Sequence, residues 1–145
     1  MTRYEHTQIG YLMIVALSLA GVVVAGLGPI VRGDWIGFVI AAVLLLTIAL
    51  FYKLTIKINH QTLRASFGIG LIHRTIPLEQ ILDCKPIRIR WWYGWGIHLT
   101  PYGWLYNISG WDAVAVTLHS GGKLSLGTDD PQGLARAIRR FASAK

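Results

Sequence analysis

The side chains best suited to binding chemistry lie in one segment of the chain, between residues 85 and 106. Tryptophan and tyrosine rings are interleaved there with lysine and arginine. Such rings prefer the headgroup region of a lipid bilayer, and each nearby cation gains about 1 kcal/mol from anionic lipid. The pattern predicts a surface for lipid or for a partner protein, made of Lys85, Arg88, Arg90, Trp91, Trp92, Trp95, Tyr102 and Trp104. Two alternatives stay open, namely that the rings pack in the core or that they line a ligand groove.

Catalytic and metal-binding chemistry has no comparable pattern in this sequence. The five histidines and the lone Cys84 never occur at metal-ligand spacing. Asp129 and Asp130 form a carboxylate pair, but they precede Pro131 and are better explained as the cap of a helix. No nucleophile–base pair is evident. We therefore expect no enzyme activity, no cofactor and no metal, with a small membrane-associated enzyme or a transport accessory subunit as the alternative.

The charge of the chain is unevenly distributed. Residues 1–52 contain two basic and two acidic side chains, so the whole net charge of +7 lies in residues 53–145. A basic, aromatic-rich region also suits nucleic acid, but no RNP-like, KH or helix-turn-helix pattern is present. We expect no nucleic-acid partner.

The elements that position this surface begin with two long apolar runs. Residues 9–31 and 35–52 contain no charged side chain, and only Arg32-Gly33-Asp34 separates them. As helices they would measure about 35 and 27 Å, against a hydrocarbon core of about 30 Å. They carry no ionisable group that would indicate transport, and small residues at four-residue spacing permit close packing. The sequence therefore predicts a transmembrane α-hairpin that serves as an anchor.

Orientation follows from the cations beside the second run. Lys53, Lys57 and Arg64 come directly after it, and such residues mark the cytoplasmic side. The prediction is a multi-pass protein of the cell membrane with both termini in the cytoplasm. A cleaved signal peptide is the alternative for residues 9–31, although the run is longer than a typical signal sequence. The lone Cys84 fits a reducing compartment.

After Lys53 the apolar residues alternate with period two, as in strands. Leu54, Ile56 and Ile58 begin this pattern, and Gly121-Gly122 fits a tight hairpin turn near its end. From Pro131 the spacing becomes helical. Residues 53–145 are thus predicted as seven antiparallel strands in a barrel or sandwich with a C-terminal capping helix, and residues 1–52 as the separate hairpin.

Six short segments of this arrangement carry a family pattern, namely residues 63–70, 74–78, 91–96, 103–107, 110–113 and 127–131. With these segments the chain resembles the bacterial PH-like membrane proteins, in which a pleckstrin-homology-type barrel lies on the cytoplasmic side of one or two membrane spans. The resemblance covers about residues 35–142 and implies a fold and a location, because the family is largely of unassigned function. The phosphoinositide site of eukaryotic PH domains is not carried over, since residues 59–62 lack its cations.

These observations together predict a non-catalytic, membrane-anchored PH-like module at the inner face of the cytoplasmic membrane of a bacterium. It would scaffold or regulate a partner there, with contact to anionic lipid headgroups. The expected partners are the lipid bilayer and an unknown membrane or cytoplasmic protein. A second copy of the chain, joined by pairing of edge strands, is a further candidate.

Overall fold

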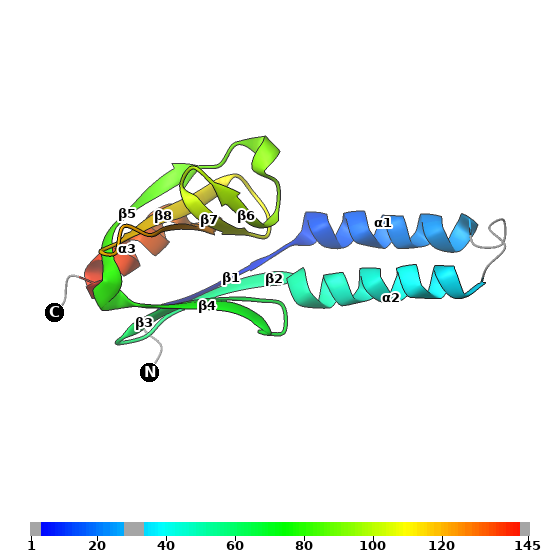
Figure 1. Cartoon of the computed structure of the whole chain (residues 1–145), viewed down its shortest axis with the longest axis horizontal. Helices are drawn as coiled ribbons and strands as arrows, with labels where there is room; N and C mark the ends of the chain where they lie inside the picture. Colours follow the sequence, from blue (N-terminus) through cyan, green and yellow to red (C-terminus); the bar gives the residue numbers. More distant parts are fainter. Residues whose placement is uncertain (1–3, 28–33, 143–145) are drawn as a thin grey trace.

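The computed structural model describes residues 4–27 and 34–142. Helices α1 (Tyr11–Leu27) and α2 (Asp34–Phe51) run side by side and project from one end of a β-rich body (Figure 1). Strand β1 (Tyr4–Ile9) leads into α1, and α2 leads into β2 (Lys53–Ile58). Because β1 and β2 pair antiparallel, with Tyr4 opposite Ile58 and Ile9 opposite Lys53, the two helices leave the body next to each other.

The body is built from two sheets. The first is antiparallel in the order β1-β2-β3-β4, with β3 at Thr62–Phe67 and β4 at Ile72–Pro77. The second has the order β5-β8-β9-β7-β6, in which β7 and β9 are parallel and the other neighbours antiparallel. Its strands are β5 (Ile81–Arg88), β6 (Gly96–Thr100), β7 (Gly103–Asn107), β8 (Asp112–Leu118) and β9 (Lys123–Gly127). Two short 3₁₀ helices, η1 (Leu78–Gln80) and η2 (Trp91–Tyr93), flank β5.

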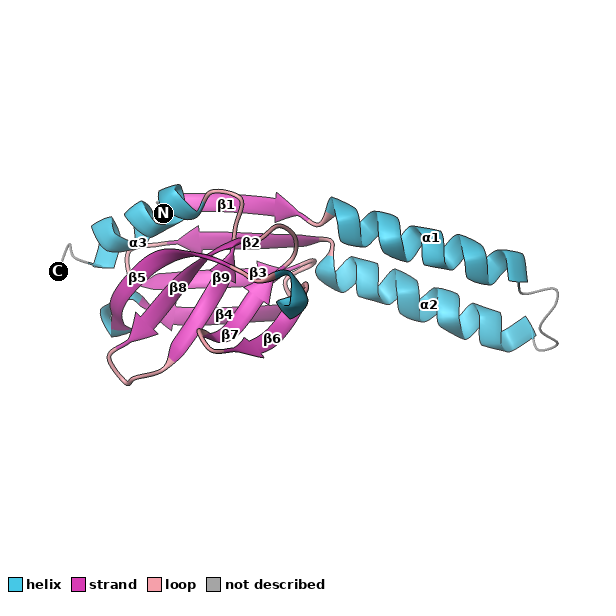
Figure 2. Cartoon of the chain, turned by 90° about the horizontal axis from the view of Figure 1, so that it is seen from above, coloured by secondary structure: helices cyan, strands magenta, loops and turns pink. Residues whose placement is uncertain are grey.

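Helix α3 (Pro131–Ala142) closes the body at the end remote from the hairpin (Figures 1 and 2). Asp130 caps it, because its Oδ1 accepts a hydrogen bond of 2.9 Å from the backbone N–H of Gly133. Leu134, Ala135 and Ile138 are buried in one core cluster with side chains from both sheets. At the edge of this buried face, Arg139 donates two hydrogen bonds, of 3.2 and 2.7 Å, to the backbone oxygen of Cys84 on β5.

The turn between β3 and β4 holds the base of α2 against the first sheet. Gly68 donates its backbone N–H to the backbone oxygen of Lys53 at 2.8 Å, with a φ of +49°. A Cβ at this position would lie 2.3 Å from the backbone oxygen of Ala49. The hairpin and the body are therefore joined at a point where only glycine fits.

We expect Gly68→Ala to lower the free energy of unfolding by at least about 2 kcal/mol, because it adds left-handed backbone strain to a backbone clash. Urea denaturation followed by tryptophan fluorescence measures this loss. Gly70→Ala is the matched control, since Gly70 also has a positive φ of +93° but has open space around its Cβ position. An equal loss of unfolding free energy in the two variants would contradict the close approach of α2 to Gly68.

The predicted transmembrane hairpin is wrong. In the part of the chain that the structure describes, no helix combines the length and the apolarity that crossing a membrane requires. Ile9 ends strand β1, and α1 has 17 residues, or about 26 Å, whereas a hydrocarbon core measures about 30 Å. The spans predicted at residues 9–31 and 35–52 are corrected accordingly, and so is the multi-pass location in the cell membrane with cytoplasmic termini. Residues 28–31 of the first run lie outside the described residues.

The predicted body of seven antiparallel strands is also wrong. The described residues form an α+β fold with three helices and with sheets of four and five strands. Strand β1 was not expected, because Tyr4–Ile9 is short and mostly polar. It forms a strand by pairing with β2, which is distant in the sequence. The helix expected after Asp130 is present as α3. No observation tests the division of the chain at residue 52, which stays a prediction.

Candidate functional site

Two exposed tryptophans lie next to each other in η2, directly after β5. The turn forms because Tyr93 and Gly94 donate backbone N–H groups to Arg90 and Trp91, and Gly94 ends it with a φ of +64°. Trp91 is 72% exposed and Trp92 54% exposed. Their rings meet edge to face with centroids 5.8 Å apart, and the Arg90 guanidinium lies 4.9 Å from the Trp92 ring. The segment thus presents two indole rings and a cation together on the surface.

This turn lies at the end of the body from which the hairpin projects (Figures 1 and 2). The β3–β4 turn is at the same end, held against α2 by Gly68, and it exposes 65% of Ile69 and 71% of Leu71. We call these residues, with Arg88 at the end of β5, the hairpin-end surface: Ile69, Leu71, Arg88, Arg90, Trp91 and Trp92.

The other predicted site residues are placed differently. Trp95 is half-buried, and its ring lies 6.1 Å from that of Trp111. Lys85 is exposed near the middle of β5, opposite Ala115. Tyr102 lies in the β6–β7 turn, at the opposite end of that pair from Gly96, and Trp104 is 51% exposed on β7. The structure therefore brings Arg88, Arg90, Trp91 and Trp92 together and leaves Lys85, Tyr102 and Trp104 apart from them.

Sequence reasoning missed Ile69, Leu71 and Trp111. A signal for the first two was present, because apolar residues inside a glycine turn (Gly68-Ile69-Gly70-Leu71) have no strand face on which to be buried. No comparable signal marks Trp111, whose contact with Trp95 depends on how the second sheet is paired.

The hairpin carries the largest apolar surface of the described residues. Phe38, Val39 and Ile40 are consecutive on α2, and all three are between 39% and 76% exposed. Consecutive residues of a helix point about 100° apart, so this surface extends around the helix and is not confined to one stripe. A helix that is apolar on all sides is normally buried. The other large apolar side chains exposed on the two helices are Tyr11, Leu12, Val15, Leu19, Val22, Val23, Trp35, Ile36, Val43, Leu45 and Leu46.

The thiol of Cys84, which lies on β5 before the site, is not activated as a nucleophile. Burial raises the pKa of the Cys84 thiol, an effect that the charge and hydrogen bond of Arg139 only partly oppose. A buried, protonated thiol is a poor nucleophile. Among the described residues, no group of three His, Cys, Asp or Glu side chains is placed to hold a metal ion. What the site presents is apolar and cationic surface, which is suited to binding.

Comparison of the chain with known protein families, characterised proteins and solved structures gives no match. Nothing in these comparisons identifies a PH-like domain, so the resemblance to that family stays a prediction.

Proposed function

We propose that this protein is a non-catalytic binding module that contacts lipid through the hairpin. The hairpin would enter the acyl chains, and the hairpin-end surface would lie among the headgroups. The β-rich body would then be held beside the lipid, where it can scaffold or regulate a partner. The proposal requires only that the hairpin contacts a bilayer from one side. It does not include a helix that crosses the bilayer.

The main observation that supports it is the exposed apolar surface that extends around both helices where they do not face each other. Large exposed apolar patches mark binding surfaces, and a folded protein partner covers one face of a helix. Acyl chains surround whatever they contact, so they can cover Phe38, Val39 and Ile40 at once. Helix α1 and residues 35–51 of α2 carry no charged side chain, which fits that environment. Asp34, the first residue of α2, is the exception.

The position of the rings and cations favours lipid further. The turn η2, which carries Trp91 and Trp92, lies at the end of the body from which the hairpin projects (Figure 1). Indole rings at that end would lie near the headgroups when the hairpin contacts acyl chains. Arg88 and Arg90 flank them, and the Lys53 ammonium lies 5.2 Å from the Tyr52 ring at the end of α2. Cations at this level would favour anionic lipid over neutral lipid.

Flotation of the full-length protein with vesicles tests the proposal. We expect the protein to float with neutral phosphatidylcholine vesicles and to bind more tightly when phosphatidylserine is included. Protein that remains in the dense fraction with both kinds of vesicle would overturn the proposal. Co-flotation of a soluble marker protein of similar charge would show that the assay lacks specificity.

We expect Arg88→Gln combined with Arg90→Gln to remove much of the preference for anionic vesicles. Each cation near the surface contributes about 1 kcal/mol, so the double variant should bind these vesicles roughly 30-fold more weakly. Its binding to neutral vesicles should be unchanged. The control is Arg64→Gln combined with Arg74→Gln, because these arginines are exposed on β3 and β4 and the net charge falls equally. An equal loss in both double variants would indicate a dependence on net charge alone.

A further inference from the structure

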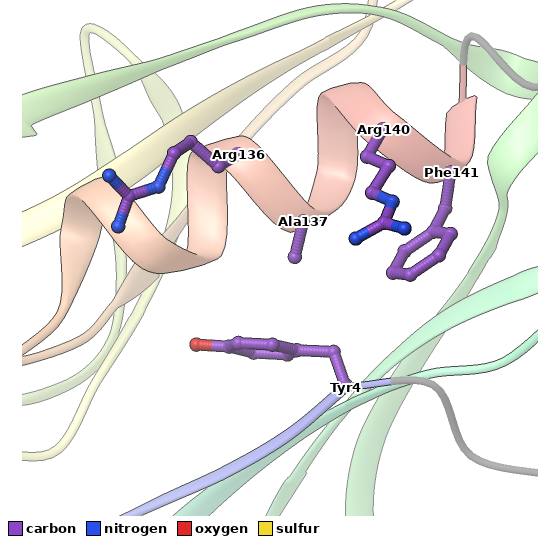
Figure 3. Close-up of a pocket in the computed structure, with 5 residues that line it drawn as sticks. All are labelled: Tyr4, Arg136, Ala137, Arg140 and Phe141. Atoms are coloured by element: carbon purple, nitrogen blue, oxygen red, sulfur yellow. The ribbon is translucent and has the colours of Figure 1, made fainter.

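A cleft of about 460 Å³ lies between the start of β1 and the outer side of α3 (Figure 3). Tyr4, Arg136, Ala137, Arg140 and Phe141 line it. Tyr4 is separated from the hairpin by the length of β1, about 17 Å, and α3 is at the end of the body remote from the hairpin (Figure 1). The cleft is therefore separate from the surface proposed to meet lipid, and a ligand would reach it from solution.

Two guanidinium groups border this cleft. Arg136 and Arg140 are four residues apart on α3, which places them on the same face of the helix. In Figure 3 Arg140 points from α3 toward Tyr4, whereas Arg136 extends along the helix, away from Arg140. Within residues 4–27 and 34–142 Lys57 pairs with Glu5 and His6 contacts Asp129, so neither arginine has a carboxylate partner there.

The floor of the cleft is the Tyr4 ring, whose hydroxyl is buried. This hydroxyl has no hydrogen-bond partner among the described residues, although a buried hydroxyl normally has one. Burial raises the pKa of Tyr4, and the charges of Asp130 and Asp129 raise it further, so the group stays a neutral O–H donor. The two carboxylates are engaged elsewhere, Asp129 with His6 and Asp130 with the backbone N–H of Gly133.

We propose that this cleft binds a phosphate monoester with an aromatic or apolar organic group. A phosphate monoester carries nearly two negative charges at neutral pH, which two guanidinium groups balance. The Tyr4 hydroxyl is buried in this structure, so a ligand reaches it only after a movement of the ring. It would then supply a third donor and gain the partner that it lacks. Ala137 and Phe141 offer apolar surface for the organic group, and the volume falls within the usual range for ligand pockets.

Titration of the full-length protein with phenyl phosphate, followed by two-dimensional NMR, tests this proposal. We expect saturable shifts of residues around the cleft and binding at least about tenfold weaker in Arg136→Gln and in Arg140→Gln. Arg74→Gln is the matched control, because it removes an exposed arginine from β4 and should bind as the original protein does. Benzoate, with one charge, should bind more weakly than phenyl phosphate. Equal binding of the two ligands, or an equal loss in Arg74→Gln, would overturn the proposal.

Tyr4→Phe separates a binding role from a structural one. The variant keeps the ring and removes only a buried hydroxyl without a partner, so thermal stability should be unchanged or higher. Binding of phenyl phosphate should nevertheless fall several-fold. Unchanged binding would contradict the assigned role of the hydroxyl. Vesicle flotation should be the same in all these variants, so failure of this proposal is distinguishable from failure of the lipid proposal.

Discussion

Replacing Phe67 with alanine is expected to lower the free energy of unfolding by about 3–5 kcal/mol, the range for a fully buried phenylalanine. Phe67 is 1% exposed at the end of β3. Its ring centroid lies 5.5 Å from that of Phe51, the last residue of α2, and 6.2 Å from that of Tyr106 on β7. One side chain thus joins the first sheet, the second sheet and the base of the hairpin. Removing it leaves a cavity where the three meet.

Urea denaturation followed by tryptophan fluorescence measures this effect as a lower midpoint with an unchanged slope. Phe67→Leu is the matched control, because it keeps most of the volume and should cost clearly less than alanine. Ile69→Ala provides a second comparison two residues further on, where the side chain is 65% exposed. A loss below about 1 kcal/mol for Phe67→Ala would contradict the packing described here.

The part of the fold that the sequence predicts is the part determined by local alternation. Leu54, Ile56 and Ile58 alternate with polar residues and are all at most 2% exposed, so the prediction of a strand with one buried face is confirmed. The hairpin between β8 and β9 is confirmed as well, although residues 119–122 separate the strands and, of the two glycines, only Gly121 has a positive φ. In such segments a register slip of one residue would expose the whole buried face, so sequence and structure agree closely.

Pairings between distant segments were not predictable in this way. The parallel pair of β7 and β9 depends on Gly103, whose Cβ position lies within 1.9 Å of the backbone oxygen of Lys123. A glycine beside a turn is compatible with many arrangements, and only the assembled sheet shows why it is needed here. Strand β1 is a second example, because its partner β2 follows it only after the entire hairpin.

The candidate site was likewise predictable only in part. The sequence identified the composition of residues 85–106 but not which side chains share a surface. Trp92 and Trp95 are three residues apart, yet Trp92 is 54% exposed in η2 whereas Trp95 is half-buried against Trp111. This difference depends on the positive φ of Gly94 and on the packing of a distant loop. Neither can be inferred from the order of residues alone.

The proposed lipid contact predicts a large effect for a single charge on the hairpin. We expect Leu45→Arg to weaken binding of the full-length protein to neutral vesicles roughly 100-fold. Leu45 is 67% exposed on α2, between residues that carry no charge, so its environment in lipid would be acyl chains. An arginine in that environment costs about 2.5–3.5 kcal/mol. Because the side chain is exposed in the folded protein, the stability of the β-rich body in urea should not change.

Leu82→Arg is the matched control for this experiment. Leu82 is 59% exposed near the start of β5, at the end of the body away from the hairpin (Figure 1). Like Leu45→Arg, this substitution replaces an exposed leucine with arginine. Because Leu82 is not on the hairpin, binding to vesicles should be retained. If Leu45→Arg floats as well as Leu82→Arg, the hairpin does not enter acyl chains and its apolar surface must be covered by something else. If only Leu45→Arg is lost from the floating fraction, the helices are the part of the molecule that meets lipid.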